Sequence, residues 1–394
     1  MRIASLHSAF AERGGAERAI LEQANYLNRR HNVVAFATYM RRNLCYPELM
    51  KDLDVRQLVG FPFTKFDLLS NVAFGLFFAR SFRSKLQSFD ILISHQQPAN
   101  WIAYNSRRPY VVQVHSLLTI LYPEFMGPSL PWDTDYDRMT INLVSNLGGY
   151  RFLRLVDSSS IKGARKVLVQ GKKLSELVSS IYGVDPVRVP FGIDFSAVQW
   201  TNPAPVLSKY SIKHPLILMA TRPLPIKRPD LMIQILPKIL RGHSTATLVI
   251  ACPPGKYQTT LHNLAVRLNV ASSTRIMSPT SLELNALYSA ADVVVFPSQA
   301  HENAPRAVLE AMRFGVPPVV WDNGWGATDF VKDGLGYRAR PYDLSDFLDK
   351  ILTLLNDRDM RDKMGRSARS AAEKYSWANV GPVFENILRQ AALQ

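Results

Sequence analysis

The sequence predicts an α/β protein made of two halves, each a parallel sheet with helices on both faces. Short runs of aliphatic and β-branched residues alternate with longer helical runs, which is typical of doubly wound sheets. This alternation occurs twice, and 394 residues are enough for two or three domains of roughly 150 residues. A polar segment with prolines and serines, 200–213, separates the two series and is predicted to be a linker. In such folds, ligands bind beyond the carboxyl ends of the strands.

The first half begins with a strand, a glycine loop and a helix. We expect a helix over Ala16–Arg30 and strands over Arg2–Leu6, Val33–Thr38, Ile91–Ser94, Tyr110–Val114 and Lys166–Val169. The pattern breaks around 187–194. The second half is expected to hold strands at Pro215–Ala220, Thr247–Cys252, Arg275–Met277, Asp292–Pro297 and Pro318–Trp321.

The composition favours an anionic partner. The 47 Lys and Arg residues exceed the 32 Asp and Glu residues, a net charge of +15 that suits a nucleic acid, a phosphorylated small molecule or a lipid surface. The sequence contains no RNP-type motif, no Cys/His finger spacing and no block of like charge. A dedicated nucleic-acid binder is therefore not favoured. The two cysteines, Cys45 and Cys252, suit a reducing compartment rather than a disulfide framework. Without a signal peptide or a long apolar run, we expect an intracellular protein, soluble or peripheral on a membrane.

The segment 296–312 combines a strand end, a polar loop and a helix start. We expect the helix to have Pro305 at its first position, so that the amides of Arg306 and Ala307 can hold an anion such as a diphosphate. Glu302 precedes the helix and Glu310 lies within it, roughly 10 Å away by the helical rise. That spacing suits one carboxylate on a sugar and one on a ribose. The alternative is a solvated loop glutamate and an ordinary helix glutamate.

Two loops after predicted strands are candidates for phosphate binding. Arg222 and Lys227 stand five positions apart and can straddle a pyrophosphate, unless they form only a basic surface loop. Gly14 and Gly15 allow a ligand to approach the backbone at a helix start, although a pair of glycines often marks a simple turn. Because neither GxGxxG nor GxxxxGK[ST] occurs, dinucleotide-binding and P-loop folds are not favoured.

Two histidines follow predicted strands at the same rim. We expect His115 to contact a sugar or phosphate and His95 to be structural. No metal-ligand spacing accompanies them, so we predict no metal site. The Phe-rich, Arg- and Lys-flanked stretch 61–85 is either a core helix or an element that docks on a membrane interface.

Taken in order, these segments resemble the family-four retaining glycosyltransferases of the GT-B fold. The resemblance rests on seven motifs along nearly the whole chain: Gly-Gly-Ala-Glu-Arg at 14–18, Val-His at 114–115, Pro-x-Gly-Ile-Asp at 190–194, Arg-x4-Lys at 222–227, Glu-x7-Glu at 302–310, Ala-Met-x-x-Gly-x-Pro at 311–317 and Tyr-Ser-Trp at 375–377.

This resemblance implies two Rossmann-like domains facing a cleft: residues 1–197 for the acceptor, 198–375 for the nucleotide sugar, and a helix at 376–394 returning to the first. It assigns the donor diphosphate to Arg222 and Lys227 and the nucleotide ribose to Glu310. Glu302 would hold the sugar hydroxyls and His115 the sugar near the reacting carbon, which makes Glu302, His115, Arg222 and Lys227 the expected catalytic residues. The remaining donor contacts would come from Gly14, Gly15, Asn303, Ala304, Pro305 and Arg306.

Two positions depart from the family pattern. Thr221 stands where the family usually has glycine, and Ala304-Pro305 where many members have Phe-Gly. Arg306 is expected to add a phosphate contact.

The resemblance therefore implies a retaining, metal-independent hexosyltransferase that needs no cofactor. The donor would be GDP-mannose or a UDP-hexose and the acceptor a hydroxyl of a lipid-linked glycan, as in the mannosyltransferases of dolichol-linked glycan assembly. The protein would then be cytoplasmic and peripheral on an anionic membrane surface, with no nucleic-acid partner. Two alternatives stay open: a nucleotide-sugar epimerase on the same fold, and a non-catalytic basic protein that binds nucleic acid or membranes.

Overall fold

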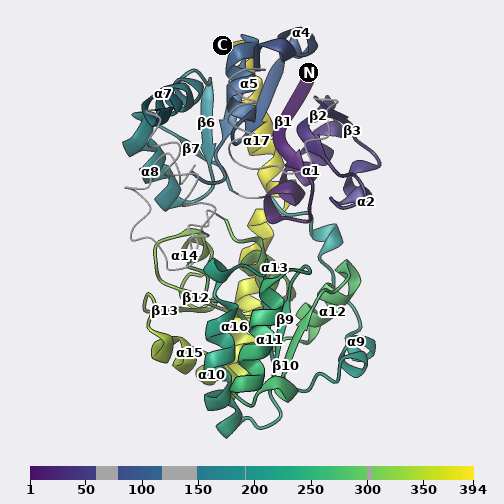
Figure 1. Cartoon of the computed structure of the whole chain (residues 1–394), viewed down its shortest axis with the longest axis vertical. Helices are drawn as coiled ribbons and strands as arrows, with labels where there is room; N and C mark the ends of the chain where they lie inside the picture. The colour runs from purple at the N-terminus through teal and green to yellow at the C-terminus, as the bar shows by residue number, and fades with distance from the viewer. Residues whose placement is uncertain (59–78, 118–148, 191, 300–303) are drawn as a thin grey trace. The chain divides into compact units, whose positions relative to one another are not determined.

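The computed structural model describes residues 1–58, 79–117, 149–190, 192–299 and 304–394. The chain forms two compact units (Figure 1). Unit 1 comprises Met1–Ile193 together with Trp377–Gln394, and unit 2 comprises Asp194–Ser376. The sequence prediction has the corresponding boundaries at 197/198 and 375/376.

Unit 1 is built on a seven-stranded parallel sheet in the order β3-β2-β1-β4-β5-β6-β7. Its strands are β1 (Arg2–Phe10), β2 (Asn32–Met40), β3 (Asp54–Gln57), β4 (Ile91–His95), β5 (Tyr110–Gln113), β6 (Lys166–Val169) and β7 (Val187–Arg188). Its helices are α1 (Gly15–Asn28), α2 (Pro47–Met50), η1 (Ala79–Phe82), α4 (Arg83–Leu86), α5 (Ala99–Ser106), α7 (Gly149–Lys162), α8 (Lys172–Tyr182) and α17 (Trp377–Leu393).

Helix α17 completes the core of unit 1, although it follows unit 2 in the chain. It packs on α1, β4 and β5 and buries Val380, Phe384 and Leu388 against Ile91 and Ile93. Helix α5 contacts β1, β4 and β5. Apolar side chains therefore fill the space beside the central strands, as expected for a parallel sheet.

Unit 2 has a six-stranded parallel sheet in the order β10-β9-β8-β11-β12-β13. Its strands are β8 (Leu216–Ala220), β9 (Thr247–Ala251), β10 (Thr274–Met277), β11 (Val293–Phe296), β12 (Pro318–Trp321) and β13 (Tyr337–Ala339). Its helices are η3 (Phe195–Ala197), α9 (Ala204–Lys209), η4 (Pro225–Lys227), α10 (Pro229–Gly242), α11 (Tyr257–Arg267), η5 (Ala271–Ser273), α12 (Ser281–Ala290), α13 (Arg306–Phe314), α14 (Gly326–Phe330), α15 (Leu344–Asn356), α16 (Arg358–Ala372) and η6 (Glu373–Tyr375).

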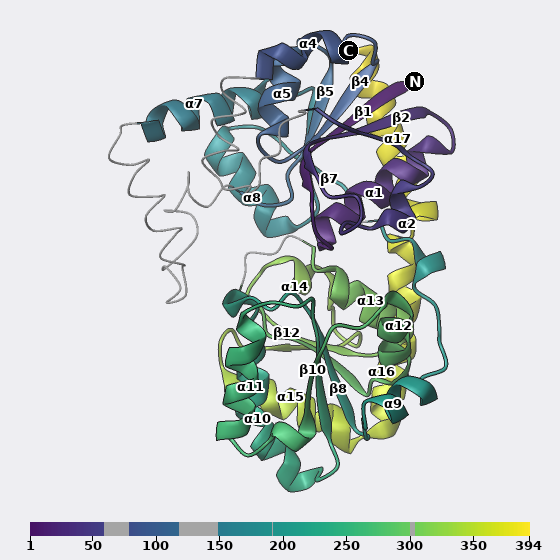
Figure 2. The same cartoon turned by 45° about the vertical axis from the view of Figure 1, so that its right-hand side comes forward.

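The sequence of strand β8 is continuously apolar because helices pack on both of its faces. Ile217 and Met219 pack with α10, α11 and α15, whereas Leu216 and Leu218 pack with α12 and α13. Figure 2 shows these two groups of helices on opposite faces of the unit 2 sheet. Alternate residues of the strand are thus buried on both faces.

The predicted linker 200–213 is wrong. Helix α9 lies within it, and Val206 and Ile212 are buried in the core of unit 2. Burial of these two apolar side chains packs the segment against unit 2. The prediction of a linker rested on the Pro and Ser content and did not take these two residues into account. The structure also contains β3, β7 and β13, which the sequence reading did not include.

Most of the Phe-rich stretch 61–85 lies outside the described residues. In the part from 79 to 85, Ala79 and Phe82 are buried, while Arg80, Arg83 and Lys85 are exposed. This part packs against α5, so its aromatic side chain belongs to the core. Among the described residues, the search for a helix of sufficient length and hydropathy to cross a bilayer finds none.

Candidate functional site

The predicted phosphate-binding loop of unit 2 lies beside the loop that leads into α13. Strands β8 and β11 are neighbours in the sheet, and these two loops follow their carboxyl ends. The backbone N–H of Gln299 donates to the carbonyl of Ile226 over 3.0 Å, and Arg228 Nη1 donates to Gln299 Oε1 over 3.1 Å. The predicted basic loop therefore contacts the segment that follows β11, at the carboxyl ends of two neighbouring strands.

The three cations of this loop have different surroundings. Arg222 is exposed, whereas the Lys227 side chain is buried. Arg228 has a left-handed backbone, with φ of 57°, and its guanidinium donates to Asp230 at 2.8 to 3.2 Å. Arg228 thus fixes the start of α10, and the diphosphate contact predicted for Arg222 and Lys227 stays a prediction.

Helix α13 begins one residue later than predicted. Pro305 occupies the N-cap position and Arg306 is the first helical residue. The Pro305 carbonyl accepts a hydrogen bond from Val308 N over 3.1 Å, which closes the first turn. The helix start follows β11, so its first amides lie at the edge of the sheet where ligands bind in α/β folds.

Glu310 is buried in a small polar network on α13. Arg306 Nε donates to Glu310 Oε1 over 2.8 Å, and the Tyr288 hydroxyl donates to Oε2 over 3.3 Å. The Arg306 and Glu310 side chains are 8% and 9% exposed. Each oxygen of a carboxylate can accept more than one hydrogen bond, and the ribose contact predicted for Glu310 stays a prediction. The phosphate contact predicted for Arg306 stays a prediction, because its guanidinium lies on Glu310.

The predicted donor residues directly before α13 are Glu302, Asn303, Ala304 and Pro305. Glu302 and Asn303 lie outside the described residues. Ala304 is half-buried and Pro305 is buried directly before α13.

The site in unit 1 contains three histidines from three neighbouring strands: His7 within β1, His95 at the end of β4 and His115 just after β5. His95 Nδ1 lies 3.1 Å from His115 Nε2, and His95 Nε2 lies 3.2 Å from Ser5 Oγ. His7 Nδ1 donates to the carbonyl of His95 over 3.3 Å. The sequence reading placed His95 and His115 together but did not include His7, because it ended the first strand at Leu6.

Burial keeps two of these rings uncharged. Desolvation, reinforced by the neighbouring histidines, lowers the pKa of His95 well below its usual value. Desolvation and His7 lower the pKa of His115 to about 3, against a smaller opposing effect of Glu17. Both rings are therefore neutral near pH 7. In the part of the chain that the structure describes, no three His, Cys, Asp or Glu side chains are arranged to hold a metal ion.

The glycine loop at α1 is followed by a carboxylate, Glu17, to which the sequence analysis assigned no role. A Cβ at Gly14 would lie 1.9 Å from Glu17 Oε2, so a larger residue there would require the Glu17 carboxylate to move. Glu17 Oε1 also lies 3.9 Å from His7 Nε2. A Cβ at Gly15 would meet nothing within 4 Å. Of the two predicted glycine contacts, Gly15 therefore has the more open surroundings.

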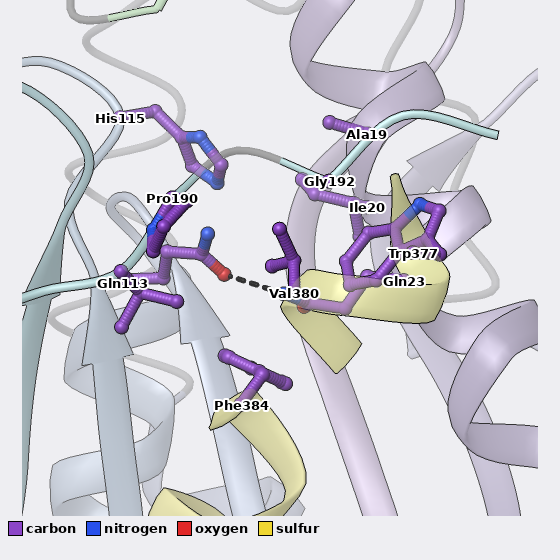
Figure 3. A pocket seen from close by; sticks show the side chains of 11 residues that line it. Ala19, Ile20, Gln23, Gln113, His115, Pro190, Gly192, Trp377, Val380 and Phe384 are labelled. Atoms are coloured by element: carbon purple, nitrogen blue, oxygen red, sulfur yellow. Dashed lines mark hydrogen bonds between the residues drawn. The ribbon is translucent and has the colours of Figure 1, made fainter. Parts of the chain in front are cut away.

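A small cavity lies behind His115 in unit 1 (Figure 3). His115 and Gln113 line one side, and Trp377 of α17 with residues of α1 line the other. Gln23 Nε2 donates to Gln113 Oε1 over 3.0 Å. The volume of about 10 Å³ is near the size of a single water, so this cavity is no sugar site.

The packing of Gly192 against Trp377 accounts for the glycine in one of the sequence motifs. A Cβ at Gly192 would lie 2.6 Å from the Trp377 ring, so the Pro-x-Gly-Ile-Asp segment needs glycine where α17 begins. The backbone N–H of Trp377 donates to the Ile193 carbonyl over 3.2 Å. Two motifs far apart in the chain, 190–194 and 375–377, thus meet within unit 1.

Comparison with known proteins gives two family matches that together cover most of the chain. The model of Glycosyltransferase Family 4 matches residues 13–197, and that of glycosyl transferases group 1 matches residues 208–371. A D-inositol 3-phosphate glycosyltransferase of Nocardia farcinica is 29% identical over 228 residues, 55% of this chain and 50% of that protein. A GDP-mannose-dependent monoacylated alpha-(1-6)-phosphatidylinositol monomannoside mannosyltransferase of Corynebacterium glutamicum is 28% identical over 184 residues, 44% of this chain and 47% of that protein. The matches thus span about half the length of these curated relatives.

The fold comparison covers nearly the whole chain. The crystal structure of Anabaena HepE in complex with UDP-glucose superposes with a TM-score of 0.77 at 18% identity, over 99% of this chain and 100% of that one. At this identity the likeness shows the fold.

Proposed function

The chain belongs to the family-four glycosyltransferases of the GT-B fold, and we propose that it transfers a hexose from a nucleotide diphosphate sugar to an acceptor hydroxyl. One observation carries this proposal: the Arg222–Lys227 loop adjoins the loop that leads to α13, and α13 holds the buried Glu310. Cations, helix amides and a carboxylate gathered at one sheet edge suit a diphosphate linked to a ribose.

Each part of the site would have a separate task. Arg222 and Lys227 neutralise the charge that develops on the departing diphosphate, and the first amides of α13 add to this. Glu310 accepts hydrogen bonds from the ribose hydroxyls. Glu302 holds the sugar hydroxyls, and His115 contacts the sugar near its anomeric carbon. Holding both reactants in place contributes a large share of the rate in such reactions.

We propose a retaining transfer in which no side chain acts as the base. The bond between the anomeric carbon and the diphosphate oxygen breaks, and the acceptor oxygen bonds to that carbon on the same face. The acceptor proton passes to the departing diphosphate. The low pKa of His115, about 3, supports this assignment, because a general base at pH 7 needs a pKa near 7.

The proposed donor is GDP-mannose or a UDP-hexose, and the proposed acceptor is a lipid-linked glycan. The name of the mannosyltransferase relative and the UDP-glucose in the HepE complex support these donors. The net charge of +15 supports an anionic membrane surface, on which the protein would be peripheral and cytoplasmic. Metal independence and the absence of a cofactor are part of the same proposal.

A thermal-shift panel with UDP, GDP, ADP and their sugar conjugates tests the donor. A ligand at a hundred times its Kd raises the free energy of unfolding by about 2.7 kcal/mol, so the matching nucleotide should raise Tm measurably. No shift with any nucleotide or sugar conjugate would contradict the proposal. Conversion of the donor to an epimer without acceptor would indicate the epimerase instead.

Two glutamate variants test the orientation of the donor. Glu310→Ala removes charge-assisted hydrogen bonds of about 1.5–3 kcal/mol, so it should weaken nucleotide binding roughly ten- to hundredfold by calorimetry. Glu302→Ala should abolish most turnover while the nucleotide still binds, because its contact forms mainly in the transition state. Glu373→Ala changes an exposed glutamate of unit 2 and serves as control. If Glu302→Ala loses nucleotide affinity and Glu310→Ala retains it, the donor lies in the reverse orientation.

A further inference from the structure

The hydrogen-bond chain Ser5–His95–His115 runs from the interior of the unit 1 sheet to the candidate site. We propose that Ser5 and His95 are positioning residues that hold the His115 ring with its proton on Nδ1. His115 then presents an N–H donor to the donor sugar. This inference rests on the proposed function for its catalytic consequence, but the position of the proton can be measured without any ligand.

The register of the sheet assembles the chain. Strands β1 and β4 pair in parallel with Ser5 opposite Ile93 and His7 opposite His95. Ser5 and His95 are 2% and 0% exposed, so water does not compete for their polar atoms. The distances are 3.2 Å from Ser5 Oγ to His95 Nε2 and 3.1 Å from His95 Nδ1 to His115 Nε2.

Only one arrangement of protons satisfies every group in this chain. The Ser5 hydroxyl hydrogen has no hydrogen-bond acceptor other than His95 Nε2 among the described residues. If Ser5 donates to Nε2, the neutral His95 ring carries its hydrogen on Nδ1 and donates it to His115 Nε2. His115 must then carry its own hydrogen on Nδ1. The reverse order would leave the buried Ser5 hydroxyl hydrogen without an acceptor, which is unfavourable.

His7 holds the strand end from which His95 projects. A carbonyl can only accept, so His7 Nδ1 must donate to the His95 carbonyl at 3.3 Å. His7 Nε2 then faces Glu17 Oε1 at 3.9 Å, on the first turn of α1. The low pKa values of His95 and His115 agree with two neutral rings joined by one hydrogen bond.

As a consequence, the Nδ1–H group of His115 acts as a hydrogen-bond donor of fixed orientation, and it is not a proton that the ring transfers. A neutral imidazole in water favours the hydrogen on Nε2, so protonation at Nδ1 has to be imposed by the surroundings. With Nε2 occupied by His95, the ring can turn only by breaking that hydrogen bond. His115 would thus offer Nδ1–H to a sugar hydroxyl oxygen or a phosphate oxygen in one orientation.

Two-bond ¹H–¹⁵N spectra of the full chain, labelled with ¹⁵N only at its 8 histidines, test the proposal directly. These spectra show which ring nitrogen carries hydrogen, and His95→Gln and His115→Gln assign the signals. We expect hydrogen on Nδ1 of both His95 and His115 in the ligand-free protein at pH 7. Hydrogen on Nε2 of His115 would overturn the proposal without the need for any other variant.

Ser5→Ala removes the first donor of the chain. We expect the His95 and His115 signals to move toward the Nε2–H form, whereas Ser106→Ala should leave them unchanged. Ser106 is the matched control because its buried hydroxyl donates to the Ala103 carbonyl over 2.6 Å, away from the three rings. Unchanged tautomers in Ser5→Ala would overturn the role of Ser5.

Kinetics separate this inference from the proposed function. With UDP-glucose and GDP-mannose as donors, release of nucleotide diphosphate by Ser5→Ala should have a kcat about tenfold lower and a nearly unchanged KM, as for a lost transition-state hydrogen bond. An unchanged kcat alongside altered tautomers would overturn the catalytic role of the chain. Absence of turnover in the unmodified protein would contradict the proposed function, while the spectra would still decide the proton positions.

Discussion

The buried ion pair on α13 predicts a large loss of stability when its cation is removed. Arg306→Met keeps most of the apolar stem but takes away the guanidinium that donates to Glu310 over 2.8 Å. With both side chains below 10% exposure, water solvates the remaining carboxylate only poorly. Removing one partner of a buried pair typically costs about 3–5 kcal/mol. At about 2–4 °C per kcal/mol for a domain of this size, Tm should fall by about 6–20 °C.

An exposed pair of the same spacing provides the control. Arg358 and Asp362 on α16 lie 3.7 Å apart with side chains 83% and 50% exposed, so Arg358→Met should cost less than about 1 kcal/mol. Arg306→Met combined with Glu310→Leu removes both charges and should recover most of the loss, because a buried pair can be replaced by apolar residues at little cost. Calorimetry of the full chain measures all three variants. A Tm for Arg306→Met equal to that of Arg358→Met would refute the reasoning.

The His214–Asp292 pair, the contact between α17 and α1, and the requirement for metal each lead to a measurable expectation. The hydrogen bond that His214 Nδ1 donates to Asp292 Oδ2, at 2.7 Å, raises the pKa of His214 above 6.5. The stabilisation from this pair is therefore complete below pH 6.5 and is lost as the pH rises through the folded-state pKa. The Tm difference between the unmodified protein and His214→Gln should therefore be larger at pH 5.5 than at pH 9, and equal differences would contradict this. Gly381→Ala should lower Tm, because a Cβ there would lie 2.0 Å from the Tyr26 ring, whereas Gly242→Ala meets no atom within 4 Å and should not. Turnover with excess EDTA should match turnover with Mg²⁺, and near-complete loss would contradict metal independence.

The sequence predicted most strands because both faces of each sheet are covered. A run such as Val293–Phe296 is apolar at every position, and the structure has β11 there, within the predicted Asp292–Pro297. Strand β3, Asp54–Gln57, buries only one of its four residues and therefore has no such signal. It is recognisable only through its pairing with β2 at the sheet edge.

The candidate site was predictable to the extent that its groups are local in sequence. The spacing of Arg306 and Glu310, four positions apart in a helix, is visible in the sequence, although their mutual burial is not. The contact between His7 and His95 joins residues 88 positions apart and depends on the register of β1 with β4. Neither composition nor periodicity carries that information.

The position of α17 has a consequence for synthesis of the protein. Unit 2 is one continuous segment of the chain, whereas unit 1 needs residues from both sides of it. When the ribosome has released 1–193, the apolar surface that Val380, Phe384 and Leu388 will cover is still open. The core of unit 1 can therefore be completed only after all of unit 2 has been synthesised. Until then, the apolar surface that α17 will cover is one to which chaperones or other nascent chains can bind.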